Sequence, residues 1–68
     1  MALAGSFGAT LRMLRIASGV SEASCARHLD ITAEELADIE SGRLEPSAEF
    51  VELVARYFGG TVEGLGLV

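Results

Sequence analysis

The sequence predicts an all-α fold, a compact bundle of five short helices in one domain. Apolar side chains recur at three- and four-residue spacing in segments that end at glycine. A Ser or Thr stands before each segment, where its side-chain oxygen can accept a hydrogen bond from a helix N-terminus. Half of the 68 residues are hydrophobic, which suffices for one small core. We expect a single domain over residues 1–68, with tails at 1–5 and 66–68.

The first helix is expected to begin after Ser6, its N-cap, and to stop at Gly19. Its inward apolar residues are predicted to be Phe7, Leu11, Leu14 and Ile16. The second helix is capped by Ser21 and runs to Leu29. It is expected to bury Cys25, Ala26 and Leu29. A tight turn at Asp30-Ile31 then leads to the third helix.

The third helix begins with a capping box, in which Thr32 caps the backbone and Glu35 reaches back to it. Leu36 and Ile39 point inward, and Gly42 ends the helix. The fourth helix opens at Ser47 and is ended by two glycines, Gly59 and Gly60. Its apolar stripe comprises Phe50, Val51, Leu53, Val54 and Phe58. Thr61 could cap a short fifth helix, Val62 to Leu65, which Gly64 and Gly66 weaken.

The net charge is −5, from ten acids against five arginines and no lysine. Nucleic-acid binders gain much of their affinity by neutralising phosphates with Lys and Arg, and they usually show a basic face. An acidic small domain is more often suited to a basic or polar protein partner, or its charge serves only solubility. The charge therefore argues against tight DNA binding.

Cys25 is the only cysteine, so no internal disulfide can form, and a reduced, cytoplasmic setting is expected. The first six residues carry no Lys or Arg and the apolar stretch is short, so neither a signal peptide nor a membrane span is expected. Glu34 and Asp38 are spaced as a helical pair of acids, and Cys25 and His28 are one turn apart. We expect no catalysis, metal site or cofactor, because a bundle this small rarely offers a cleft and a lone cysteine on an apolar helix face is usually core.

From position 8 to position 65 the chain is similar, residue by residue, to the phage-repressor helix-turn-helix family of the Cro/CI or XRE-like type. The residues that carry the resemblance are Gly8, Leu11, Leu14, Arg15, Gly19-Val20-Ser21, Ala26, Ile31-Thr32, Leu36, Ile39-Glu40-Ser41-Gly42-Arg43, Pro46-Ser47, Leu53, Ala55, Gly59, Val62 and Leu65. The resemblance implies a lambda-repressor-like bundle that contains a helix-turn-helix. It also implies a partly buried ion pair between Arg15 and Glu40, with Ala26 as a packing residue.

The resemblance places DNA contacts at the start of the second helix, on the exposed face of the third and in the loop after it. These positions are Ser21, Glu22, Thr32, Ala33, Glu34, Glu35, Asp38 and Arg43. Several are acidic where the family prefers neutral or basic residues. Glutamate can accept a hydrogen bond from the cytosine amino group, but many phosphate contacts must accompany it.

Two functions remain open. The first is a small transcription regulator that binds operator DNA as a dimer, with Arg12 and Arg27 near phosphates and a dimer contact through Val62, Leu65, Leu67 and Val68. The second is a modulator, an antirepressor or antiactivator whose acidic third helix binds a basic surface of another transcription regulator. The family resemblance favours the first, and the chemistry of the exposed residues favours the second.

Overall fold

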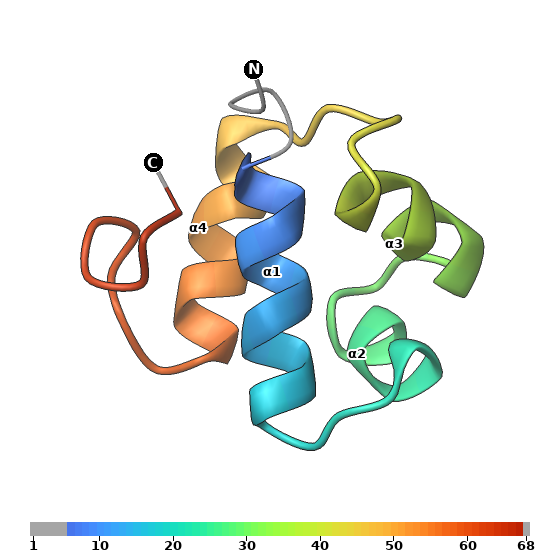
Figure 1. Cartoon of the computed structure of the whole chain (residues 1–68), viewed down its shortest axis with the longest axis horizontal. Coiled ribbons are helices and arrows are strands. Elements are labelled where there is room, and N and C mark those ends of the chain that lie inside the picture. The colour runs from blue at the N-terminus through green and yellow to red at the C-terminus, as the bar shows by residue number, and fades with distance from the viewer. Residues whose placement is uncertain (1–5, 68) are drawn as a thin grey trace.

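The computed structural model describes residues 6–67, the side chain of Ser6 excepted, and this part of the chain forms four α-helices. They are α1 (Ser6–Ala17), α2 (Glu22–His28), α3 (Ala33–Glu40) and α4 (Ala48–Tyr57) (Figure 1). All the predicted helices but the fifth are therefore present. None of the helices in residues 6–67 has the length and apolar character needed to cross a membrane.

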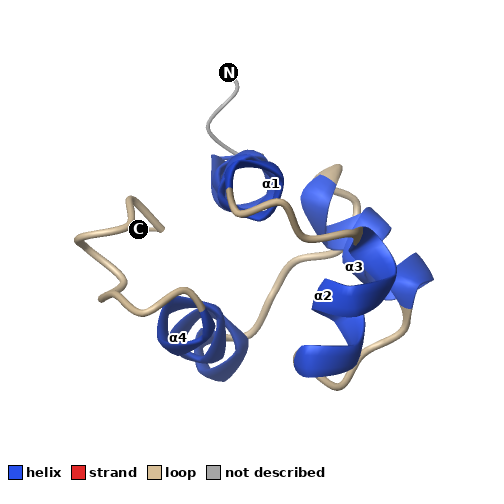
Figure 2. Ribbon diagram, turned by 90° about the horizontal axis from the view of Figure 1, so that it is seen from below, coloured by secondary structure: helices blue, strands red, loops and turns tan. Residues whose placement is uncertain are grey.

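The helices surround a core with α1 at the centre of the view in Figure 1. There α1 lies between α4 on one side and the α2–α3 pair on the other. Seen from below, α1 and α4 are nearly end-on, and the α2–α3 pair forms the third corner of the molecule (Figure 2). Helix α3 packs against both α1 and α2. This arrangement leaves the outer side of α3 free of other helices.

Short-range hydrogen bonds set the helix boundaries. Ser21 Oγ accepts from Ser24 N at 3.1 Å at the start of α2, and Ser47 Oγ accepts from Phe50 N at 3.1 Å at the start of α4. Both predicted caps are confirmed, because each satisfies a backbone donor that the helix leaves free. Gly42 and Gly59 follow α3 and α4 with φ angles of 86° and 75°, a left-handed conformation that glycine adopts without strain.

The turn between α2 and α3 is made by Asp30, whose φ is 61°. Asp30 N donates to Arg27 O at 3.2 Å and Ile31 N donates to Ala26 O at 3.0 Å. This pattern closes the end of α2 with its own carbonyls. Because aspartate tolerates the left-handed region better than most residues, the chain can reverse here without a glycine.

The core contains apolar residues from all four helices and from the C-terminal segment. Its buried members are Leu11, Cys25, Ala26, Leu29, Leu36, Ile39, Val54, Ala55 and Leu67. Burial raises the pKa of the Cys25 thiol, which keeps it protonated and unreactive. The prediction that Cys25 is a core residue is confirmed.

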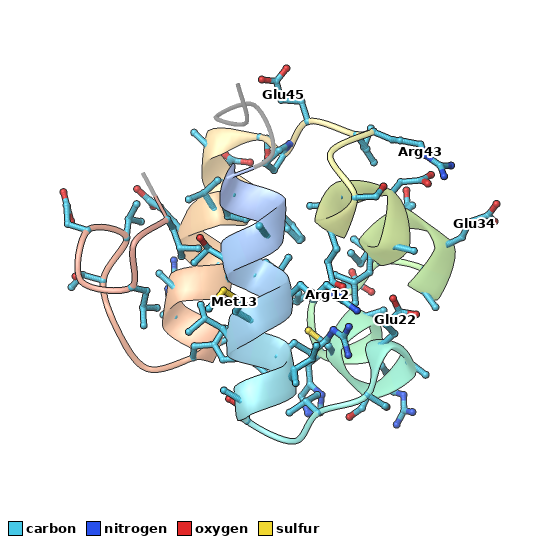
Figure 3. The ribbon with its side chains drawn as sticks, viewed as in Figure 1. Arg12, Met13, Glu22, Glu34, Arg43 and Glu45 are labelled. Atoms are coloured by element: carbon cyan, nitrogen blue, oxygen red, sulfur yellow. The ribbon has the colours of Figure 1, made fainter. Side chains whose placement is uncertain are left out.

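Two predicted core residues are wrong. The side chain of Ile16 is 54% exposed, and Leu53 also reaches solvent. On α1 the inward face carries Leu11 and Arg15, so Ile16, about 100° further around the helix, turns outward. Met13 is also exposed on α1 and projects away from α2 and α3 (Figure 3).

The predicted fifth helix is a single turn. Thr61 Oγ1 accepts from Gly64 N at 2.9 Å, and Leu65 N donates to Thr61 O at 2.9 Å. The cap therefore forms as predicted, but no helix follows. Gly66 takes a left-handed φ of 75° after only one turn, and two glycines in this short stretch disfavour helix on entropic grounds.

The C-terminal segment folds back beside α1 and α4, on the side away from α2 and α3 (Figures 1 and 2). Leu67 is only 5% exposed, and the half-buried Val62 and Leu65 pack against the same core. A Cβ atom at Gly60 would lie 2.8 Å from Leu65 Cγ, so glycine is needed there for close packing. Leu67 therefore belongs to the core of the single chain, and the expected dimer contact through this segment stays a prediction. Val68 lies outside the described residues.

Replacing Leu67 with alanine should lower the free energy of unfolding by about 2 to 3 kcal/mol, because a buried side chain is lost and a cavity remains. Urea denaturation followed by circular dichroism measures this loss. The matched control is Leu53→Ala, which removes the same atoms from an exposed position and should cost under about 1 kcal/mol. Equal losses in the two variants would show that Leu67 does not belong to the core.

Candidate functional site

A buried ion pair joins α1 to the end of α3. Arg15 Nε donates to Glu40 Oε2 at 2.7 Å, and Arg15 Nη2 donates to Glu40 Oε1 at 3.0 Å. The two side chains are 10% and 4% exposed. Arg15 Nη1 also donates to Val20 O at 3.1 Å, which ties the turn before α2 to the same group. The geometry is the one expected of this pair, and it fixes the position of α3 against α1.

The hydrogen bond to Glu40 raises the pKa of Arg15 above its ordinary value. Burial works in the opposite direction, because a charged group loses water, and the charges of Glu40 and Glu22 again favour the protonated form. Arg15 is therefore a permanent buried cation whose charge is balanced by the buried Glu40, with the exposed Glu22 nearby. Its role is structural.

The close approach of α1 to α3 depends on Gly8. A Cβ atom at this position would collide with the carbonyl oxygen of Ile39 and would lie 2.8 Å from that of Glu40. Only glycine lets the first turn of α1 reach the backbone at the end of α3. Sequence reasoning recorded Gly8 as part of a family pattern, but its contact partner became visible only in the structure.

The start of α3 is a complete capping box. Thr32 Oγ1 accepts from Glu35 N at 3.0 Å, and Glu35 Oε1 accepts from Thr32 N at 3.0 Å. The prediction is confirmed. Both side chains are exposed but already occupied by backbone groups of their own helix. Of the two acids in the first turn of α3, it is therefore Glu35 that has a structural role, because it completes the capping box.

The outer side of α3 and its neighbours carries the predicted site residues. Ser21, Glu22, Thr32, Ala33, Glu34, Glu35 and Arg43 are exposed, and Asp38 is half-buried. Glu34 and Arg43 project from the α3 side of the molecule, away from α1 (Figure 3). The structure thus presents these residues at the surface around α3, as the resemblance implied.

Arg43, the cation in the loop after α3, is 78% exposed at its side chain and lies 3.6 Å from Asp38. The Arg43 N–H group also donates to Asp38 O at 2.8 Å, so the loop is held near the acid. An exposed ion pair of this kind contributes little stability. It does, however, partly neutralise the charge of Arg43.

A surface cavity of about 380 Å³ lies where α1, α2 and α3 meet. It is lined by Arg12, Glu22, Ala37, Glu40 and Ser41. Arg12 extends from α1 on the side opposite Met13, toward Glu22 at the start of α2 (Figure 3). Sequence reasoning placed Arg12 near phosphates but did not foresee this acid beside it. The available signal was the spacing of Arg12 and Arg15, which puts them one helical turn apart.

Within residues 6–67, no three His, Cys, Asp or Glu side chains gather in a group that could hold a metal ion. Cys25 and His28 do not form a reactive pair: Cys25 is buried, whereas the His28 ring lies 5.3 Å from the Tyr57 ring and its Nδ1 is 2.9 Å from Ser24 O.

Comparison with known proteins agrees with this geometry. Residues 6–65 match the model of a family described as a helix-turn-helix domain. The chain belongs to this helix-turn-helix family. No curated protein sequence matches the chain.

Two solved structures are similar to it, both crystal structures of the clp gene regulator ClgR from Corynebacterium glutamicum. The first is 28% identical, with a TM-score of 0.87, and the match covers 98% of this chain and 71% of the ClgR chain. The second is 29% identical, with a TM-score of 0.86, and the match covers 96% and 83%. The family and these neighbours indicate a regulatory protein rather than an enzyme.

Replacing Glu40 with alanine should lower the free energy of unfolding by about 3 kcal/mol or more, because Arg15 would remain buried without its partner. Chemical denaturation measures the change. Glu52→Ala, at an exposed position of α4, is the control and should stay within about 0.5 kcal/mol of the original protein. An unchanged midpoint for Glu40→Ala would contradict the account of the pair.

Proposed function

We propose that this chain is a small transcription regulator of the Cro/CI or XRE-like type that binds operator DNA in the cytoplasm. The observation that carries the proposal is the surface around α3, where the start of α2, the outer side of α3 and the exposed Arg43 are left free of other helices. In helix-turn-helix proteins the second helix of the motif lies in the major groove, and the first crosses the backbone. The similarity to a gene regulator supports the same reading.

The residues proposed to meet DNA have different parts. Ser21 and Arg43 can donate hydrogen bonds to phosphate oxygens, and Arg12 supplies a further exposed cation beside α2. Ala33 and Glu34 lie at the start of α3, where base edges are read, and a glutamate can accept from a cytosine amino group. With so few cations, useful affinity requires two half-sites and hence a dimer. Its contact has to involve residues other than the buried Leu67.

A second function is favoured by the charge of the same surface. Glu22, Glu34 and Glu35 are exposed there, Asp38 is half-exposed, and Arg43 lies beside Asp38. Because neighbouring acids repel phosphate, such a surface is better matched to a basic patch on another transcription regulator. In that case the chain is a modulator, an antirepressor or antiactivator, that keeps the fold without touching DNA.

DNA-binding measurements on the unaltered protein distinguish the two functions. Tight, sequence-selective binding to its own promoter at physiological salt would support the DNA-binding regulator and remove the modulator. Failure to bind any promoter fragment, together with a defined complex with a basic helix-turn-helix regulator, would do the reverse. Fluorescence anisotropy with labelled promoter fragments and with a non-specific duplex of equal length provides the comparison.

The acids of α3 supply the corresponding mutational test. Changing Glu34 to Gln and Asp38 to Lys should raise the affinity for DNA and steepen the dependence of log K on log salt by about one unit for a new phosphate contact. The matched control is Glu49→Gln with Glu52→Lys on α4, which changes the net charge equally on another helix. An equal rise in the control would mean that net charge alone is responsible, and that α3 does not face DNA.

A further inference from the structure

Three charged side chains line the cavity between α1, α2 and α3, and a fourth, that of Arg15, contacts two of them. Arg12 and Arg15 come from α1, Glu22 is the first residue of α2, and Glu40 is the last residue of α3. Arg15 Nη2 lies 3.0 Å from Glu40 Oε1 and 3.9 Å from Glu22 Oε2. Two cations thus face two carboxylates, and the cluster is neutral as a whole.

The two carboxylates have unequal roles. Glu40 accepts two hydrogen bonds from Arg15 and is buried, so it alone balances the buried guanidinium. The Glu22 side chain is 47% exposed, and the 3.9 Å between its Oε2 atom and Arg15 Nη2 is too long for a hydrogen bond. An exposed ion pair at this distance adds little to stability. The fold therefore does not require an acid at position 22.

Glu22 is the exposed acid of this cluster. Arg12 is exposed and lines the same cavity, whereas most of Arg15 is covered and only its Nη2 group is near Glu22. An anionic oxygen that entered this cavity to meet Arg12 would come close to the Glu22 carboxylate, which lines the same cavity. It would also be repelled by the Glu22 charge, which the half-exposed position screens only in part.

We propose that Glu22 is a built-in competitor for phosphate, whose carboxylate, 3.9 Å from Arg15 and at the same cavity as Arg12, repels a phosphate oxygen of DNA that would otherwise approach these arginines. The effect is to hold down the DNA affinity of this face. The part of the inference that concerns DNA rests on the proposed function, and the part that concerns anion binding does not. Glu22 is accordingly a residue that limits affinity, distinct from Glu35, which caps α3, and from Glu40, which completes the buried pair.

The first test uses inorganic phosphate and the protein alone. In the Glu22→Gln variant, titration with phosphate should shift the NMR signals of the Arg12 and Arg15 Nε–H groups at a concentration several-fold lower than in the original protein. Glu34→Gln removes the same charge from the outer side of α3 and should leave these signals as they are in the original protein. Adding Arg12→Gln to Glu22→Gln should abolish the gain. An unchanged melting midpoint in each variant ensures that the fold is intact.

The second test uses duplex DNA. Glu22→Gln should raise the affinity several-fold at low salt and increase the salt slope by about one unit, as expected for one recovered phosphate contact. The double variant Arg12→Gln/Glu22→Gln should lose that increment in affinity and salt slope. Any change in DNA affinity that Glu34→Gln causes should be the same with Arg12→Gln present or absent.

The outcomes of the two tests separate the inference from the proposed function. A phosphate gain in Glu22→Gln without DNA binding by any variant would sink the DNA-binding function and leave the competition intact. Identical phosphate titrations of Glu22→Gln and the original protein, or a gain that survives Arg12→Gln, would overturn the competition whatever the DNA results are.

Discussion

The Arg15–Glu40 pair is the contact on which the rest of the structure depends. It joins α1 to the end of α3 by two short hydrogen bonds, and a third bond from Arg15 reaches Val20 before α2. One guanidinium thereby fixes the relative positions of three helices. The small apolar core could not do this alone, because apolar contacts are not directional and fix orientation less sharply than hydrogen bonds. The outer face of α3 is presented to solvent as a result of this placement.

Gly8 and Ala26 make that arrangement possible because neither has a large side chain. Gly8 allows α1 to touch the backbone of Ile39 and Glu40, and Ala26 lies buried where α2 packs against α3. Larger side chains at either position would separate the helices and lengthen the ion pair. The surface around α3 is therefore held by small residues and one charged pair beneath it. Of its own exposed side chains, Ser21 caps α2, and Thr32 and Glu35 form the capping box of α3.

Much of this organisation could be predicted from the sequence because the signals were local. Ser21, Thr32 and Ser47 each cap a helix through a contact three residues away, so the spacing of the residues predicts these contacts.

The fifth helix was predicted from its cap, which does form, but two glycines prevent the helix from continuing beyond one turn. Leu67 was misplaced because burial of a terminal residue depends on a long-range contact with the core. Ile16 was misplaced because the apolar pattern of α1 extends almost all round the helix, so the pattern could not say which side faces inward. The cavity of Arg12 and Glu22 needed the relative positions of three helices, which no short pattern contains.

The distance along the chain between Arg15 and Glu40 also bears on how the protein folds. The turn at Asp30 closes through bonds that span three and five residues, whereas the ion pair joins positions 25 residues apart. Closing a longer loop costs more chain entropy, so the α2–α3 turn can form before its anchor to α1 exists. We therefore expect the contact that orients the three helices to be made late, after the local elements are in place. A contact of that kind acts chiefly as a lock on the finished molecule, governing how slowly the native chain opens rather than how quickly it first comes together.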